Sequence, residues 1–293
     1  MAIYQIDREY ELIIGDYRKS DNAIVIPNLQ CTFEISKSSS NKKKSNSATI
    51  EIYNLNDEHR ALIEQEYVAA VFSAGFINPG MARLFAGQVV DSSTRKSGTE
   101  IITQVKMGSG YTDLNHELIS QLAAPGQSYR DVYEEIRKSL PSVVRGVYNG
   151  TNLNNQVING YPLIGEPRRI LDELSELTQT EWRVDDGVLY VNDQSGGIND
   201  NLKLCYIISE ESGLIERPYR VAGDKRRTKK DKIKKKGIQF KCLLNPRIVP
   251  GEYIKLEYPN FDGYYKVDSV RMYGDFRGNP WYSEVFCSDK VKV

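Results

Sequence analysis

Residues 237–287 constrain the fold more than any other stretch, because apolar and polar residues alternate there with a period of two. The first strand expected in this stretch carries four apolar residues on one face: Ile238, Phe240, Cys242 and Leu244. Such alternation is typical of a strand with one buried face. Asn245 and Pro246 end the strand, since proline lacks the N–H group that a sheet ladder needs. The stretch therefore predicts successive strands joined by turns.

Three further strands are expected after this turn. The second lies at 253–258 and the last at 281–287. In the third, the apolar residues change face between Val267 and Val270. This change of phase predicts a β-bulge near residues 268–269, of the kind that bends strands in barrels.

The first hundred residues also alternate. Strands are expected at 31–36, 48–53, 67–72, 84–90 and 101–107. The first two would pair as a hairpin, and Asn56 would cap a short helix that follows them. The connection between them, SKSSSNKKKSNS at 36–47, is basic and rich in serine. We expect it to be too hydrophilic to pack, and to form a long mobile loop.

The middle of the chain changes to a helical period. Ser128 begins a first helix as a capping pair with Asp131, and Pro167 suits the first turn of a second. Two apolar stripes follow these starts: Val132, Ile136 and Leu140, then Ile170, Leu174 and Leu177. Residues 181–184 and 188–191 next predict a hairpin around an Asp-Asp-Gly turn. Residues 149–160, rich in Asn and Gly, are expected to be a loop.

These patterns predict a mainly β protein with an α+β insertion. We expect a first β-barrel domain at 1–110, an α+β domain at 111–195 and a second β-barrel domain at 196–293. A basic loop at 223–236 would interrupt the last of these, because nine of its fourteen residues are Lys or Arg. Such a block repels itself and cannot be buried, so we expect either a solvated loop or a contact with an acidic partner or nucleic acid.

Several sequence blocks, in this order and spacing, resemble one protein family. The blocks are SATIEIYNLNDEHRALIE (47–64), LFAGQVVDSS (84–93), YPLIGEPRRILDELSELTQTEWRVDDGVLYV (161–191), ESGLIERP (211–218), LLNPRIVPG (243–251), YYKVDSV (264–270) and GDFRGNPWY (274–282). They resemble the baseplate hub proteins of tailed phages, particularly contractile ones of the myovirus kind. That family shares a barrel fold with the tail tube protein and with secretion-system spikes.

The resemblance implies a structural tail protein. Its two tube-like barrels would flank the α+β domain and superimpose on each other, with 48–53 and 253–258 in comparable positions. Three chains would then form a homotrimeric ring of pseudo-six-fold symmetry. The ring would meet tail tube or tube initiator proteins above and the central spike below, and also the tape measure protein and baseplate wedge proteins. The expected location is the virion, in the tail baseplate, after synthesis in the host bacterial cytoplasm.

Composition narrows the alternatives. The 39 basic and 39 acidic residues cancel, which argues against a dedicated nucleic-acid binder of high pI. The 19 tyrosines suit contact surfaces and equally suit strands. No apolar run has transmembrane length, so we expect no membrane contact. Cys31, Cys205, Cys242 and Cys287 lack CxxC spacing, and we expect them to be reduced and structural.

We expect no catalytic residue, no metal site and no cofactor. His59 and His116 have no Cys or acidic neighbours at ligand spacing, and both suit the surface of a helix. Asp185 and Asp186 form a carboxylate pair, but adjacent residues in a hairpin turn should point apart and stay solvated. The loop DQSGGIND at 193–200 lacks the regular spacing of a calcium loop.

Two other function classes stay open. A single-stranded nucleic-acid-binding protein would place tyrosines on OB-like barrel faces beside the basic residues 225–236. A tail-associated cell-wall hydrolase component would need a poised acid or a metal, and the sequence offers no such group. The mass of the protein in solution would separate a trimer from either of these.

Overall fold

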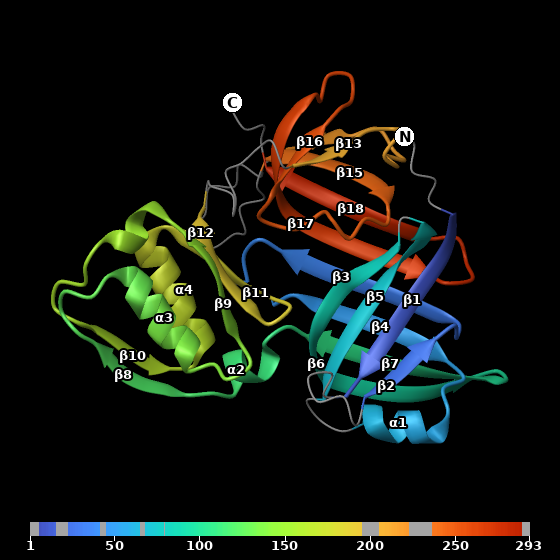
Figure 1. Ribbon diagram of the computed structural model, residues 1–293, viewed down its shortest axis with the longest axis horizontal. Coiled ribbons are helices and arrows are strands. Elements are labelled where there is room, and N and C mark those ends of the chain that lie inside the picture. Colours follow the sequence, from blue (N-terminus) through green and yellow to red (C-terminus); the bar gives the residue numbers. More distant parts are fainter. Residues whose placement is uncertain are drawn as a thin grey trace.

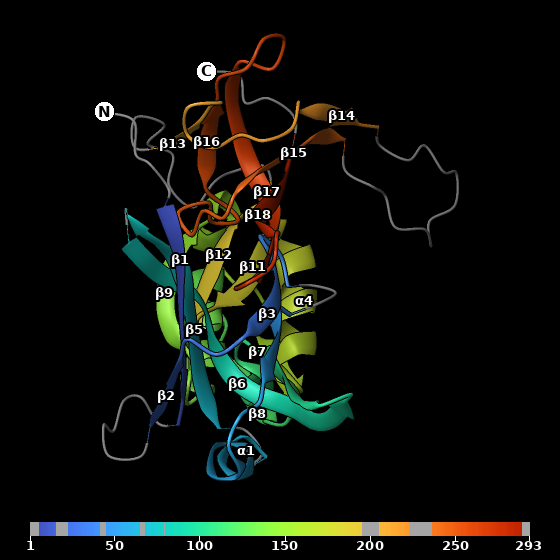
Figure 2. The same ribbon diagram turned by 90° about the vertical axis from the view of Figure 1, so that its right-hand side faces the viewer.

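The computed structural model of the chain describes residues 6–15, 23–41, 45–64, 68–78, 80–194, 205–222 and 236–288. Most of the described residues lie in strands, and most of these strands belong to one sheet. We call this sheet and its attached strands the β body, and the segment from α2 to β12 the α+β unit. Figure 1 shows the α+β unit beside the β body. In both ribbon views the C-terminal strands lie above the N-terminal ones (Figure 2).

The β body takes strands from both ends of the chain. Its N-terminal elements are β1 (Ile6–Ile14), β2 (Ile24–Pro27), β3 (Cys31–Ser38), β4 (Ser47–Tyr53), α1 (Asp57–Ile63), β5 (Ala69–Asn78), β6 (Gly80–Ser97) and β7 (Glu100–Gly108). Its C-terminal elements are β13 (Tyr206–Ile208), β14 (Tyr219–Val221), β15 (Gly237–Leu243), β16 (Tyr253–Leu256), β17 (Gly263–Asp275) and β18 (Trp281–Ser288). The main path of the sheet runs β14-β15-β18-β17-β3-β4-β7-β6-β5-β1-β2, while β16 pairs with β13 and β17.

Strand β17 joins the two ends of the chain. One of its edges pairs with β18, and the other pairs first with β16 and then with β3. The register shifts between Val267 and Ser269, which confirms the bulge expected there. Because of this shift, residues of opposite parity reach the same core. Tyr265 and Val267 precede the shift, Val270 and Met272 follow it, and all four are buried.

A single hydrophobic core fills the β body. It contains residues of both chain ends, so the two β regions share one interior. The rings of Phe33 and Trp281 meet edge to face with centroids 5.0 Å apart, and Trp281 Nε1 donates to the carbonyl of Gly75 at 3.1 Å. Arg8 of β1 links the two chain ends as well, because it donates to the carbonyls of Asp275 and Asn279 at 2.7 and 2.8 Å.

The α+β unit has a core of its own. Its elements are α2 (Tyr111–Asn115), β8 (Ile119–Ala123), α3 (Tyr129–Lys138), β9 (Val144–Asn149), the 3₁₀ turn η1 (Thr151–Asn154), β10 (Tyr161–Gly165), α4 (Pro167–Thr178), β11 (Thr180–Asp185) and β12 (Val188–Asp193). β8 pairs with β10, and β12 lies between β11 and β9. Ser128 and Asp131 form the expected capping box, and Pro167 occupies the first turn of α4.

The fold class is confirmed: the protein is mainly β and carries an α+β insertion. The sheets are not closed barrels, however. In two separate barrels the N-terminal and the C-terminal strands would each close on themselves, but here the C-terminal strand β17 pairs with the N-terminal strand β3. The superposition of 48–53 on 253–258 stays a prediction. β4 has antiparallel neighbours on both edges, whereas β16 runs parallel to β13. The domain boundaries also stay predictions.

Two local expectations are wrong. Ser39, Asn41 and Asn46 of the serine-rich connection are buried, although the connection was expected to be too hydrophilic to pack. The Ser39 N–H donates to the Asp268 carbonyl of β17, while Asn41 and Asn46 bond to the α+β unit and to each other, and these hydrogen bonds remove the cost of burial. Leu177 was expected on the buried stripe of α4, but its side chain is 52% exposed. No described helix is long and apolar enough to span a membrane.

Candidate interaction surfaces

One side of the main sheet faces solvent from β15 across β18, β17, β3, β4 and β7 to β6. We call this side the polar face. Along each strand its residues alternate with buried ones, as in β4, where Ala48, Ile50 and Ile52 enter the core. The charged residues of the polar face are Glu34, Glu51, Asp91, Arg95, Lys106, Lys241, Arg271, Asp275 and Glu284.

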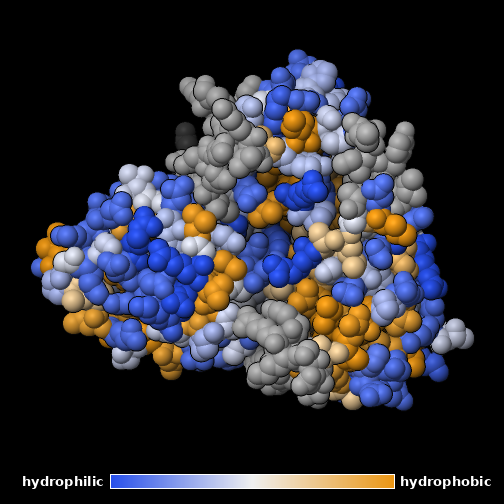
Figure 3. Space-filling view, viewed as in Figure 1, coloured by the Kyte–Doolittle hydropathy of each residue, from blue (hydrophilic) through white to orange (hydrophobic). Residues whose placement is uncertain are grey.

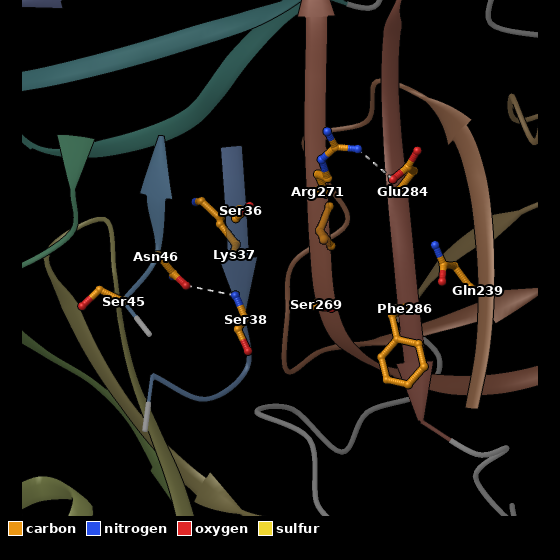
Figure 4. Close-up of a pocket in the computed structure, with 11 residues that line it drawn as sticks. Ser36, Lys37, Ser38, Ser45, Asn46, Gln239, Ser269, Arg271, Glu284 and Phe286 are labelled. Atoms are coloured by element: carbon orange, nitrogen blue, oxygen red, sulfur yellow. Dashed lines mark hydrogen bonds and ion pairs between the residues drawn. The ribbon is translucent and has the colours of Figure 1, made fainter. Parts of the chain in front are cut away.

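The polar face is hollowed where β3, β17 and β18 meet (Figure 4). A pocket of about 320 Å³ lies there, and Lys37, Asn46, Arg271, Glu284 and Phe286 are among its lining residues. In the figure Arg271 and Glu284 point toward each other from neighbouring strands, and Asn46 accepts from the Ser38 N–H. Most of the lining residues are polar, and the apolar exceptions are Val270 and Phe286.

The band of strands that carries the polar face, from β14 to β6, has an open strand edge at each end. Residues 80–88 of β6 pair with β5 and residues 88–97 pair with β7, and Gln88 pairs with both, so β5 and β7 lie on opposite edges. Beyond Gln88 the β5-side edge of β6 has no partner strand among the described residues. At the other end β14 pairs with β15 alone in the described chain. Unpaired strand edges are templates for pairing with another chain.

A second site is the polar seam, where the β11–β12 turn of the α+β unit meets the β body. The turn residues Asp186 and Gly187 both have positive φ angles, 50° and 77°, as the expected Asp-Gly hairpin turn requires. Lys37 Nζ lies 2.9 Å from Asp185 Oδ1 and 3.4 Å from Asp186 Oδ1. The Lys37 and Asp185 side chains are each 9% exposed, so the expectation of two solvated carboxylates is wrong.

Further partners explain why these carboxylates can be buried. The Ala86 N–H donates to Asp186 Oδ1 at 2.8 Å, and Arg83 Nε lies 3.2 Å from Asp186 Oδ2. Burial alone would raise the pKa of Asp185, but Lys37 and Arg183 outweigh it and hold that pKa below its ordinary value. Burial does raise the pKa of Asp186, against the opposing effect of Lys37. The pKa values of the two neighbouring carboxylates are therefore shifted in opposite directions, that of Asp185 down and that of Asp186 up.

Two asparagines complete the seam by imitating a strand. The Asn41 N–H donates to the Trp182 carbonyl at 2.8 Å, and Asn41 Oδ1 accepts from the Val184 N–H at 2.7 Å. Asn46 Nδ2 donates to the Val184 carbonyl at 3.3 Å. The edge of β11 is thus capped by the β3–β4 connection, which fixes the α+β unit against the β body.

A second buried ion pair crosses the seam. Lys266 Nζ of β17 lies 2.5 Å from Glu181 Oε1 of β11, with the two side chains 3% and 6% exposed. Beside it the Arg183 guanidinium lies 4.6 Å from the centroid of the Tyr190 ring. The docking of the two bodies is therefore mainly polar, and Figure 3 shows hydrophilic residues at the centre of the view, between them. Sequence reasoning missed this site, because Lys37, Lys266 and the Asp-Asp turn are far apart along the chain.

The other residues considered for chemistry lie apart. Asn56 caps α1 by accepting from the His59 N–H at 2.7 Å, and His116 is the exposed C-terminal cap of α2. Asp193 accepts from the N–H and hydroxyl of Thr151, while residues 195–200 lie outside the described part. The described residues contain no group of three or more His, Cys, Asp or Glu that could hold a metal ion. All four cysteines are free.

The basic residues 223–235 also lie outside the described part. The strands that flank them are described: Val221 of β14 pairs with Gly237 of β15. The expectation for the basic loop therefore stays a prediction.

Known structures share this fold. No protein-family model and no curated protein matches the sequence. The 43 kDa tail protein of prophage MuSo2 from Shewanella oneidensis matches with a TM-score of 0.65 and 11% identity, over 96% of this chain and 98% of that chain. A tail protein from Neisseria meningitidis matches with a TM-score of 0.67 and 10% identity, over 97% of each chain.

A component of the type VI secretion system of E. coli matches with a TM-score of 0.59 and 12% identity, over 96% of this chain and 77% of that chain. It is described as structurally similar to the T4 bacteriophage tail proteins gp27 and gp5. At these identities the comparison shows the fold. The chain has the β-rich fold of phage tail proteins, and the resemblance noted in the sequence is confirmed at that level.

Proposed function

We propose that this chain is a structural hub protein of a phage tail baseplate, whose three copies form a ring between the tail tube and the central spike. The observation that carries the proposal is the continuous band of strands from β14 to β6, which has at each end a strand edge without a partner strand among the described residues. The fold shared with tail proteins along almost the whole chain supports it. The proposed role is non-catalytic.

The two edges lie at opposite ends of an eight-strand band, β14-β15-β18-β17-β3-β4-β7-β6. A head-to-tail contact would pair β6 beyond Gln88 of one copy with β14 of the next. Such contacts close into a ring only if the rotation between copies divides a full turn. Three copies, each with two tube-like regions, would give the pseudo-six-fold symmetry that a hexameric tube requires.

The partners follow from this arrangement. The ring would contact tail tube or tube initiator proteins on one side and the central spike on the other, with the tape measure protein and baseplate wedge proteins as further neighbours. It would be part of the virion, assembled from chains made in the host cytoplasm. The secretion-system neighbour described as similar to gp27 and gp5 supports a place beside a spike.

Mass in solution tests the proposal. Light scattering should give three times the 33.3 kDa of one chain, and negative-stain images should show three-fold rings with a central opening. Dimers or open filaments would contradict the hub. A monomer that binds single-stranded DNA would favour the nucleic-acid alternative, and a monomer that cleaves cell-wall glycan would favour the hydrolase.

Two neighbouring proline variants test the edge. Successive N–H groups of a strand point to opposite edges, so one of Ser93→Pro and Thr94→Pro removes a donor from the open edge of β6 and the other from the ladder with β7. We expect the open-edge variant to stay folded by circular dichroism and to lose the trimer. If both variants remain trimeric, the β6 edge is not the interface.

A further inference from the structure

The two-stranded ribbon of β8 and β10 is open at its edges and on one face. Among the described residues the two strands pair only with each other. Figure 1 shows the ribbon at the lower border of the α+β unit, and Figure 3 shows hydrophobic residues along that border. Ile119, Ala123 and Leu163 belong to the core of the unit, so the opposite face of the ribbon is left to solvent.

This outer face of the ribbon is apolar. Leu118, Leu122 and Ile164 are 78%, 71% and 60% exposed, and each alternates with a buried neighbour along its strand. The register places Pro162 opposite Leu122, and Ser120 opposite Ile164. Single exposed leucines are normal on protein surfaces, but apolar residues gathered on one face of adjacent strands mark an interaction site.

The segments that build this border contain no charged residue. Residues 118–129 and 146–165 have no Asp, Glu, Lys or Arg, although 27% of the chain is charged. The two segments lie side by side, because β8 pairs with β10 and a further bridge joins Ser128 to Gln156. A charged partner would lose hydration here without meeting an opposite charge, so the border favours an uncharged partner.

Pro162 decides which edge of the ribbon can accept a further strand. Proline has no N–H, and the Val157 N–H donates to the Gln127 carbonyl where the same register continues beyond the strands. Hydrogen-bonded and non-hydrogen-bonded pairs alternate along an antiparallel ladder, so Pro162 and Leu122 form a non-hydrogen-bonded pair. Each therefore directs its backbone groups to its own open edge. The β10 edge lacks a donor at Pro162, whereas Ser120 and Leu122 present N–H and C=O groups on the β8 edge.

The β8 edge lacks the usual protection of an open strand edge. Natural edge strands carry charged residues or proline, which hinder pairing with other chains. β14 carries Arg220, and β6 beyond Gln88 carries Arg95 and Lys96. β8, with the sequence ISQLA, carries neither a charge nor a proline. An edge without either is expected to be covered when the protein meets its partner.

The size of the ribbon indicates what covers it. Strands of five residues at about 3.3 Å each are about 17 Å long, and two strands are about 10 Å wide. That face measures under about 200 Å², whereas a stable interface buries about 800 Å² on each partner. It is too small to hold a second copy of the chain. A single extended segment needs less area, because its main-chain hydrogen bonds to the strand edge add to the side-chain contacts.

We propose that the β8–β10 ribbon is a docking site for an uncharged, extended segment of a second protein, which adds to the open edge of β8 as a third strand. Alternate side chains of that segment are apolar and extend the outer face formed by Leu118, Leu122 and Ile164. The site goes beyond the ring described above and does not depend on it, since a single copy of the chain carries the whole ribbon.

Peptide selection tests the site. The full-chain protein selects from a yeast-displayed library of random twelve-residue peptides, and the affinity of enriched peptides is measured by fluorescence anisotropy. Ser120→Pro removes a donor from the open edge and leaves the ladder with β10 intact. Leu122→Lys places a charge on the outer face, and Leu177→Lys is its matched control, because Leu177 is also exposed but lies on α4. Circular dichroism first establishes that the variants are folded.

We expect the enriched peptides to be uncharged and to alternate apolar and polar residues. Ser120→Pro should weaken their binding about tenfold, the worth of one backbone hydrogen bond at the upper end of its range. Leu122→Lys should weaken it at least as much, and Leu177→Lys should bind as the wild type does. Bound peptide should slow amide hydrogen exchange in residues 118–123. The mass in solution should be the same for the wild type and all variants.

Three results would overturn the inference. A selection that enriches no peptide, or enriches charged ones, would show that the ribbon does not bind an uncharged strand. Peptides that bind Ser120→Pro and Leu122→Lys as tightly as the wild type would have their site elsewhere. A changed mass of Ser120→Pro would show that β8 pairs with a second copy of the chain. A monomeric wild type, by contrast, would refute the ring and leave this docking site standing.

Discussion

Replacing Lys37 by methionine should loosen the α+β unit from the β body. Lys37 is the cation shared by Asp185 and Asp186. It lies at the C-terminal end of β3 in the β body, whereas the two carboxylates belong to the α+β unit. Methionine keeps most of the length of the side chain and removes only the charge. The variant therefore leaves two neighbouring carboxylates in the seam without their common partner.

The expected cost is about 3 kcal/mol of unfolding free energy. Removing one member of a buried pair typically costs 3–5 kcal/mol, because the remaining charge is left uncompensated. The lower end applies here, since Asn46 Nδ2 still donates to Asp185, and Asp186 keeps the Ala86 N–H and Arg83. Lys106→Met is the matched control, because its pair with Asp91 is about half exposed and should be worth less than ~1 kcal/mol.

The two tryptophans allow each body to be observed separately. Trp182 is buried in the core of the α+β unit, and Trp281 is buried in that of the β body. Urea unfolding followed by fluorescence in Trp281→Phe reports the α+β unit, and the same experiment in Trp182→Phe reports the β body. We expect Lys37→Met to lower the midpoint seen by Trp182 more than the midpoint seen by Trp281.

Acid provides a second check on the same pair. The folded-state pKa of Asp185 lies below its unfolded value of about 3.9, so its contribution to stability is full above about pH 4 and is lost as the pH falls through the folded pKa. The difference between the wild type and Lys37→Met should therefore shrink below about pH 4. A cost under ~1 kcal/mol at neutral pH, or a cost that does not change on acidification, would refute the reasoning.

Four further outcomes are expected. Deleting 225–236 should change the unfolding free energy by less than ~1 kcal/mol in calorimetry, and a large drop in melting temperature would show that the tract is packed. Gly274→Ala should cost about 1–3 kcal/mol in urea unfolding, because its Cβ would lie 2.5 Å from ring atoms of Phe33 and Trp281; an unchanged midpoint would show that the rings can shift. Ser128→Ala should cost about 1 kcal/mol by removing a helix cap, measured by thermal unfolding against a distant exposed serine-to-alanine change. Elemental analysis should find no stoichiometric zinc, and finding it would contradict the expected absence of a metal site.

The sequence predicts those features of this fold that depend on neighbours along the chain. The change of face between Val267 and Val270 locates the bulge of β17, because side-chain parity is a property of a single strand. The Ser128 cap, the Pro167 helix start and the Asp-Asp-Gly turn are likewise local signals, and all three are present.

Pairings between distant residues could not be predicted in this way. Alternation shows that β3 and β17 each have a buried face, but it does not say that they are neighbours. For the same reason the sequence predicted two closed barrels where one open sheet exists. Asn41 and Asn46 are buried although they lie in a hydrophilic stretch, because a hydrophilic residue need not be exposed. An asparagine that satisfies strand N–H and C=O groups can be buried, and its partners are about 140 residues away.

The position of β17 between β3 and β18 sets an order of events during synthesis. β3 lies near the start of the chain, yet its partner strand is made more than two hundred residues later. At 5–20 residues per second the ribosome needs roughly 10 to 50 s to cover that distance. Throughout this interval the edge of β3 is without its final neighbour, while the strands from β4 to β7 can already pair. The nascent chain therefore carries an open strand edge until β17 has been made. Pairing of this edge with other nascent chains makes synthesis the stage at which aggregation is most favoured.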